Sequence, residues 1–113
     1  MQELERKAYI FSVETIGLAM SMEKEGGQRE LARKLKKASG QVYTLLTDAL
    51  EAEENKDFAD LLRASHQQAM NARDYLKQTG LSQAGLRNKQ KELTGMVEEV
   101  IERMDNMLGK IIY

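Results

Sequence analysis

The chain has 113 residues, a length that suits one domain built around one hydrophobic core. Hydrophobic residues make up 42% and charged residues 31%, a composition that suits a soluble globular protein rather than a disordered one. The formal net charge is only −1, so no strong overall field draws the protein to nucleic acid or to an anionic membrane. The sequence has no cysteine, which excludes disulfides, thiolate metal sites and cysteine nucleophiles.

Composition also predicts the fold class. Proline and tryptophan are absent and aromatic residues are 5%, whereas β-proteins use proline at turns and aromatic and β-branched residues in strands. Residues with high helix propensity dominate instead, so we expect an all-α protein. No apolar run approaches the roughly 18 residues that span a membrane, and the segment MQELERK lacks the apolar stretch of a signal peptide. We therefore expect a cytoplasmic protein.

Three short stretches interrupt the helical pattern: 26–27, 53–56 and 79–82. Asn55 is expected to cap the third helix, Gly80 to follow its end at the C′ position, and Ser82 to cap the fourth. Gly85 falls either inside the fourth helix or before it. The breaks predict one domain, residues 1–113, with helices at about 3–25, 28–53, 56–79 and 82–112. Because the turns are short, neighbouring helices must be antiparallel, in an up-down-up-down four-helix bundle.

Each predicted helix carries an apolar stripe whose residues are spaced alternately three and four apart, the seam of a left-handed bundle. The stripes are Leu4, Ala8, Phe11, Thr15, Leu18 and Met22; Leu31, Leu35, Ala38, Val42, Leu45, Ala49 and Ala52; Phe58, Leu62, Ser65, Ala69, Ala72 and Leu76; and Leu93, Val97, Val100, Met104, Met107 and Ile111.

Further apolar residues lie outside these stripes. One four-helix core cannot bury apolar residues on more than one face of each helix, so we expect self-association into a homo-oligomer. The predicted interface residues are Ile10, Val13, Met20, Leu46, Leu50, Ile101, Leu108 and Ile112. The alternative is a wide core stripe together with ordinary exposed leucines.

The only histidine, His66, lies in the segment ENKDFADLLRASHQQA. The residues three and four positions away from it are Leu62, Arg63, Ala69 and Met70, and none of them is a metal ligand. The chain also offers few residues for a hydrolytic triad, since it has one imidazole and no thiol. We expect a half-buried or interfacial histidine, no metal or other cofactor, and no enzymatic activity.

The segment LARKLKKASGQVYTLLTDALEAEENKDFADLLRASHQQAMNARDYL resembles the centre of a four-helix-bundle family named for a protein encoded in intervening sequences of 23S ribosomal RNA genes. The family has an E-A-x-x-A-x-S-x-x-D-F turn, and the resemblance covers about residues 31–80. The matching positions are Asp48, Ala49, Ala52, Lys56, Asp57, Phe58, Leu62, Ala69 and Leu76. The chain departs from the family at Tyr43 and Leu45, where a Gly-x-Asn pair is usual, and at Asp74-Tyr75, where a Tyr-Trp pair is usual.

This resemblance implies a cytoplasmic bundle that assembles into a ring of five. The family is also similar to accessory proteins of diversity-generating retroelements, which form such rings and bind nucleic acid beside a reverse transcriptase. For most members a biochemical role is not established.

The predicted topology separates the charges. Residues 14–40 and 67–96 form one end of the bundle and hold 11 basic and 6 acidic residues, a net charge of +5. The other end holds the remaining 6 basic and 12 acidic residues, a net charge of −6. A basic end of this kind can bind phosphates. The candidate residues for RNA or DNA binding are Arg29, Arg33, Lys36, Lys37, Arg87 and Lys91.

Two functional hypotheses follow. The first is a homo-oligomeric structural or adaptor bundle with an unidentified protein partner. The second is a sequence-independent nucleic-acid-binding ring, for which Tyr43 and Tyr75 are the only nearby aromatics that could stack on bases. The alternative for the basic end is a solvated face whose charges pair with Glu23, Glu25 and Glu30 across the hairpin, or with the acidic end of a neighbouring copy.

Overall fold

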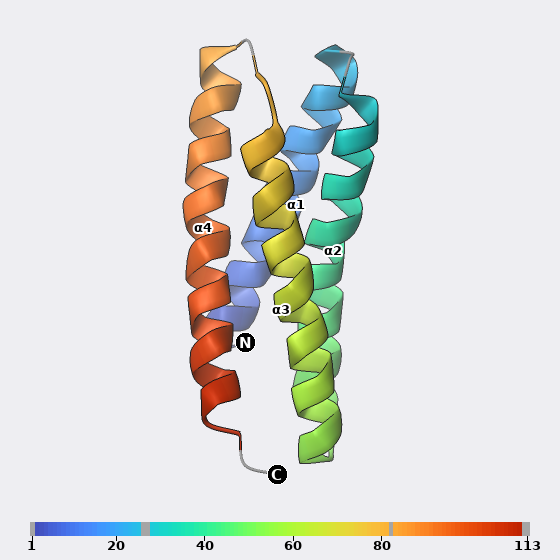
Figure 1. Ribbon diagram of the computed structural model, residues 1–113, viewed down its shortest axis with the longest axis vertical. Helices are drawn as coiled ribbons and strands as arrows, with labels where there is room; N and C mark the ends of the chain where they lie inside the picture. Colours follow the sequence, from blue (N-terminus) through green and yellow to red (C-terminus); the bar gives the residue numbers. More distant parts are fainter. Residues whose placement is uncertain (1, 26–27, 82, 112–113) are drawn as a thin grey trace.

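The computed structural model describes residues 2–25, 28–81 and 83–111, which form four α-helices and no strand. The helices are α1 (Glu3–Glu25), α2 (Arg29–Glu51), α3 (Asn55–Gln78) and α4 (Ala84–Gly109). They alternate in direction, and α1 packs on α2, α2 on α3, α3 on α4 and α4 on α1 (Figure 1). The Cα atoms extend over 47 × 22 × 21 Å. The all-α four-helix bundle predicted from the sequence is confirmed.

The turn between α2 and α3 is made of residues with extended backbone. Ala52 has φ −69° and ψ 135°, and Glu54 has φ −99° and ψ 142°. The carbonyl of Glu54 accepts a hydrogen bond from the amide of Phe58 at 3.0 Å, so Glu54 is the N-cap and Asn55 is the first helical residue. The prediction that Asn55 caps α3 was wrong by one residue, because the chain enters the helix earlier.

At the opposite end, side chains satisfy the last turn of α3. The carbonyl of Leu76 accepts hydrogen bonds from the Thr79 hydroxyl at 2.8 Å and from the Gln90 amide at 2.5 Å. Gly80 follows the C-cap Thr79, as predicted, and exchanges two hydrogen bonds with the Gln28 side chain. These contacts tie the α3–α4 connection to the start of α2.

The sequence leaves open whether Gly85 lies inside α4, and the structure decides this. Gln83 is the N-cap residue and Gly85 is the second residue of the helix, so Gly85 lies inside α4. Ser82, the predicted cap, and the Gly26-Gly27 break lie outside the described residues.

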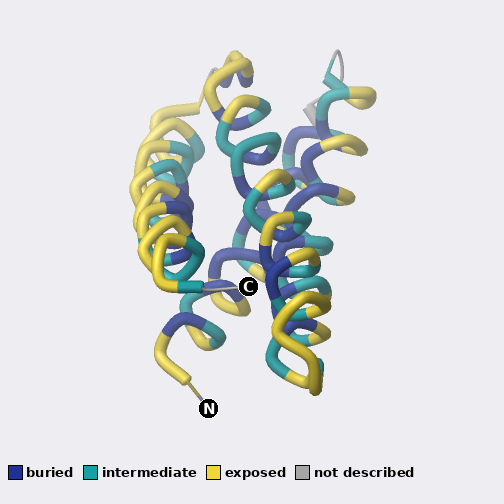
Figure 2. The backbone as a smooth tube through the Cα atoms, turned by 60° about the horizontal axis from the view of Figure 1, so that its bottom comes forward, coloured by how far each residue is buried: buried dark blue, intermediate teal, exposed yellow. Residues whose placement is uncertain are grey.

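The core follows the predicted stripes most closely in α1, where all six stripe residues are buried. In the other helices the buried residues also lie on the side of the helix that is turned to the centre of the bundle (Figure 2). The second stripe, on α2, differs from the prediction: Leu46 is fully buried, while the stripe residues Leu31, Leu45 and Ala52 are only half-buried. In α3, Ala59 is buried and Phe58 is half-buried at the edge of the core.

Small side chains form the contact between α2 and α3. The buried Ser65 hydroxyl of α3 donates to the carbonyl of Val42 in α2 at 2.7 Å, a bond that requires the two backbones to lie close together. Buried alanines on both helices make this approach possible: Ala32, Ala38, Ala49, Ala59, Ala69 and Ala72.

One core hydroxyl gives a direct test of this packing. Thr15 is 0% exposed, and its hydroxyl has no hydrogen-bond partner within the described residues. Burying an unpaired hydroxyl is unfavourable, so replacement by an apolar group of the same shape is expected to stabilise the fold. We predict that Thr15→Val raises the free energy of unfolding by about 1 kcal/mol in urea denaturation.

Ser65→Ala is the matched control, since it removes a buried hydroxyl that does donate a hydrogen bond. It should lower the free energy of unfolding by about 1 kcal/mol. A loss of stability in Thr15→Val would show that the Thr15 hydroxyl is satisfied in the folded protein.

Candidate interaction surfaces

The outward side of α1 is apolar and uncharged over three turns. Its residues are Tyr9, Ile10, Val13, Gly17 and Met20, which we call the α1 outer face. The four large side chains of this set are 48%, 40%, 51% and 53% exposed, in chain order. The predicted interface residues Ile10, Val13 and Met20 thus lie on the surface rather than in the core. Exposed apolar groups of this size in one row are a common feature of protein interfaces.

Charged pairs border the α1 outer face on both sides. Toward α4, Glu14 of α1 forms an ion pair with Lys89, and this hydrogen bond raises the pKa of Lys89 above its ordinary value. Toward α2, Lys36 forms an ion pair with Glu23 of α1. The face therefore has an apolar centre and a polar rim, the arrangement found at many protein interfaces.

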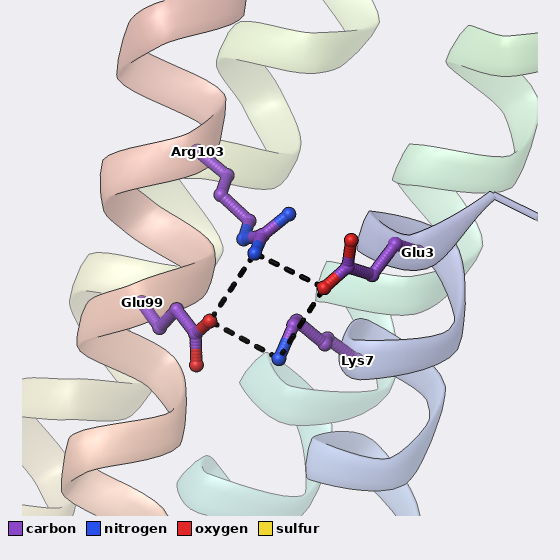
Figure 3. Close-up of polar contacts among 4 residues, drawn as sticks. All are labelled: Glu3, Lys7, Glu99 and Arg103. Carbon is purple, nitrogen blue, oxygen red and sulfur yellow. Dashed lines mark hydrogen bonds and ion pairs between the residues drawn. The ribbon is translucent and has the colours of Figure 1, made fainter.

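Four residues form a further charged cluster between α1 and α4, with acids and bases alternating (Figure 3). Lys7 lies 3.0 Å from Glu99 and 3.9 Å from Glu3, while Arg103 lies 3.1 Å from Glu3 and 3.4 Å from Glu99. The hydrogen bond from Lys7, and then its charge, hold the pKa of Glu99 below the ordinary value. The cluster links the first turns of α1 to the second half of α4.

The other predicted interface residues lie elsewhere. Leu46 is 0% exposed and Ile101 is 8% exposed, so both belong to the core of the bundle and present almost no surface to a second copy. Both predictions are corrected, because α2 and α4 bury a wider stripe than a strict seam. Leu50 and Leu108 are partly buried against the core. Ile112 lies outside the described residues.

The six basic residues predicted to bind nucleic acid do not form one site. Arg33 and Lys37 line the same groove between α2 and α3. Arg29 and Lys36 lie toward α1, where they line a hollow with Met20. On α4, Arg87 donates to the carbonyl of Leu81 at 3.2 Å, and Lys91 is exposed.

The α2–α3 groove has a volume of about 460 Å³, and Ala38 lies in its lining. Its remaining lining side chains are Arg33, Lys34, Lys37, Gln41, Gln68, Asn71 and Tyr75. A second hollow of about 400 Å³ shares Lys34 and Tyr75 with it and extends toward Gln28 and Gln78. Lys34, Gln68 and Asn71 are groove residues that the sequence did not predict. The sequence feature that could have identified them is a row of mostly polar residues beside each apolar stripe, spaced three and four residues apart.

The groove carries positive charge that its surroundings balance only in part. Arg33 pairs with Glu30, whose pKa is lowered chiefly by the hydrogen bond from Arg33 and then by its charge. Lys34 and Lys37 have no carboxylate within ion-pair distance in the described part of the chain. Of the pairings predicted across the hairpin, Lys36 pairs with Glu23 of α1, whereas Glu30 pairs with Arg33 of its own helix; the Glu25 side chain lies outside the described part of the structure.

The same two helices form an acidic hollow at their other end. It has a volume of about 490 Å³, and four carboxylates line it: Asp48, Glu51, Asp57 and Asp60. The surface of the α2–α3 pair is therefore basic near the start of α2 and acidic near its end. This is the direction of polarity that the sequence predicts for the bundle.

His66 occupies the half-buried position expected from the sequence. Its side chain is 16% exposed, and its Nε2 lies 2.6 Å from Oδ1 of Asp105 on α4. The carboxylate is out of line with the ring N–H direction, so the contact is not a well-formed hydrogen bond. Among the described residues, no three His, Cys, Asp or Glu side chains are grouped so that they could hold a metal ion.

None of the four helices, over the residues that the structure covers, combines the length and apolar character needed to cross a membrane. Comparison of the chain with protein-family models, with curated proteins and with solved structures finds no match. The resemblance noted in the sequence therefore stays a prediction.

The charged cluster between α1 and α4 should make stability depend on pH. The folded-state pKa of Glu99 lies below its ordinary value of 4.5, so its stabilising contribution is present above pH 4.5. The contribution is lost as the pH falls through the lowered pKa. We predict that Glu99→Gln is less stable than the wild type at pH 7 and equally stable at a pH below that pKa, by thermal unfolding.

Glu102→Gln is the matched control, because Glu102 is exposed on the same helix and has no ion pair among the residues described. In this variant, the difference in stability between pH 7 and acid pH should equal that of the wild type. A Glu99→Gln protein as stable as the wild type at pH 7 would show that the cluster does not stabilise the fold.

Proposed function

We propose that the protein is a non-enzymatic, self-associating helical bundle that acts as a structural or adaptor module for a protein partner. The observation that carries this proposal is the α1 outer face, an uncharged row of exposed apolar side chains with a charged rim. Between Ala8 and Met22 the only charged residue is Glu14, and it points to α4. Covering this row with a second copy removes its apolar area from water, which favours association.

The number of subunits follows from how the face is used. Two copies that meet through the same face form a two-fold dimer, whereas a closed ring pairs the face with a different patch of the neighbour. The resemblance found in the sequence implies a ring of five in the cytoplasm, and this is the assembly that we propose. The solution mass distinguishes the two arrangements.

A charge placed in the α1 outer face should disrupt the assembly. We predict that Val13→Glu with Met20→Glu yields monomers where the wild type is oligomeric, as measured by light scattering after size exclusion. The reason is that each carboxylate would be desolvated at the contact without a partner. Val13 and Met20 are more than half exposed within one chain, so the fold of the monomer should persist.

Thr44→Glu provides the control, because Thr44 is exposed on the outer side of α2. Its mass should equal that of the wild type. A wild type that is monomeric at micromolar concentration would contradict the proposal.

Nucleic-acid binding by the basic end is the second candidate function. It is favoured by Lys34 and Lys37, which form no ion pair among the described residues and lie near the exposed Arg33; the charge of Lys34 acts on Glu30 only from a distance, as a minor cause of the lowered pKa of Glu30. Phosphate binding should weaken steeply with ionic strength, by a slope of roughly 0.7 for each neutralised phosphate of a single strand. An RNA complex whose affinity is insensitive to salt would speak against this candidate.

A further inference from the structure

We propose that the α2–α3 groove binds an extended, acidic peptide segment of a protein partner. This inference rests on the proposed adaptor function, for which it supplies the binding site and the chemistry of the partner. It concerns a surface different from the α1 outer face, because α3 packs on α2 and α4 rather than on α1.

The two walls of the groove offer different chemistry. The α2 wall is cationic, with Arg33, Lys34 and Lys37. The α3 wall is neutral, with Gln68, Asn71 and Tyr75, and no carboxylate lines this part of the groove. An occupant that matches both walls carries negative charge on one side and neutral hydrogen-bonding groups on the other. A peptide with acidic side chains has this combination.

The charges of the α2 wall are available to a ligand. Lys34 and Lys37 have no ion pair within the residues described, and the exposed Arg33 pairs only with Glu30 from its own helix, one turn earlier. Pairs of this exposed kind are weak, so an acidic ligand can replace Glu30 at little cost. Carboxylates that bind here gain partners without breaking a contact between helices.

The amides favour a peptide over a nucleic acid. Gln67, Asn71 and Gln68 form a row of side-chain amides on α3, joined by hydrogen bonds of 3.0 and 3.5 Å. The side-chain amide of Gln41, on the opposite wall, makes no hydrogen bond in the described structure. Side-chain amides both donate and accept, as peptide backbone requires, whereas the phosphodiester oxygens that a sequence-independent nucleic-acid site contacts only accept. Tyr75 is the single aromatic in the groove, too few for a run of stacked bases.

The length of the groove also fits a short segment. The groove and the adjoining hollow extend along α2 from Gln28 to Gln41, and at 1.5 Å per residue this is about 20 Å. An extended peptide of about six residues covers that distance. Glu30 lines only the adjoining hollow, so the acidic side chains should lie beside Lys34 and Lys37 and the neutral ones beside Gln78.

The test is a binding titration with defined probes at about 50 mM salt, where surface charges are weakly screened. One probe is a labelled six-residue peptide with blocked ends and four glutamates, and a second has glutamines in their place. A third is a ten-nucleotide RNA of mixed sequence. We expect the acidic peptide to bind more tightly than both of the others.

Charge variants locate the site. Lys34→Gln with Lys37→Gln should weaken binding of the acidic peptide about tenfold, since two ion pairs are lost. Lys77→Gln with Lys91→Gln is the matched control: both residues are exposed near the same end, outside the groove. It should change the affinity less than twofold. Equal weakening by both variants would overturn the proposal, because binding would then follow overall charge alone.

Amide variants separate a peptide from a simple polyanion. Gln68→Ala with Asn71→Ala should weaken the acidic peptide several-fold and leave binding of tripolyphosphate unchanged. If the variant bound both ligands more weakly, or bound both as well as the wild type does, peptide recognition by the α3 wall would be contradicted. RNA that binds more tightly than the peptide and depends on Lys34 and Lys37 would replace this inference with the nucleic-acid candidate.

The mass of each variant is measured in the same samples. A groove variant that stays oligomeric but binds no less peptide refutes the inference and leaves self-association intact. A wild type that is monomeric and binds the peptide in the groove refutes self-association alone.

Discussion

The close contact between α2 and α3 is the feature on which the rest of the surface depends. The hydrogen bond from Ser65 to the carbonyl of Val42, at 2.7 Å, joins a side chain of one helix to the backbone of the other. Only small neighbours such as Ala38 and Ala69 allow that approach. Beside this contact, mostly polar residues of the two helices form the walls of the groove.

The helix α1 differs from the other three in the way its apolar residues are used. It buries one complete stripe, including Phe11 and Met22 at 0% exposure, and still presents an apolar row to solvent. Its charged residues are held at the borders, where Lys7 and Glu14 pair with α4. The α1 outer face therefore combines a rigid helix, an apolar centre and a polar rim, which are the elements of an interface between copies.

The two surfaces can work together. Because α1 contacts α2 and α4, while α3 lies diagonally across the bundle from it, an assembly formed through the α1 outer face leaves the α3 wall of the groove at a distance (Figure 1). Each copy in an oligomer then offers one basic groove. Several weak sites held in one assembly bind a partner with repeated acidic segments more strongly than a single site does.

The fold was predictable from the sequence because its signals repeat in every helix. Stripes with three- and four-residue spacings predicted all four helices, and in α1 they predicted each buried seam residue, from Leu4 to Met22. The choice between Leu45 and Leu46 was not predictable, because both are apolar and adjacent, and the rotation of α2 in the bundle decides which of them is buried. The prediction that Asn55 caps α3 was wrong because a favourable capping residue does not by itself determine where the helix begins; Glu54 is the N-cap.

The candidate site was predictable in part. The overall charge pattern pointed to Arg33 and Lys37, and exposure of Ile10, Val13 and Met20 follows from the second stripe on α1. Lys34, Gln68 and Asn71 were missed because a groove depends on how close two helices lie, which a single sequence does not show. Leu46 and Ile101 were assigned to an interface because a wide core stripe and an exposed stripe look the same in sequence.

The most direct test of the central claim is oxidative footprinting of the methionines in the oligomer, read by mass spectrometry. Met22 and Met104 are fully buried within one chain and serve as slow references, while Met70 and Met96 are partly buried. Met20 is 53% exposed in a single chain, and we expect it to react as slowly as Met22 once the α1 outer face is covered. A Met20 that reacts faster than Met70 and Met96 in the oligomer would contradict the assignment of this face to self-association.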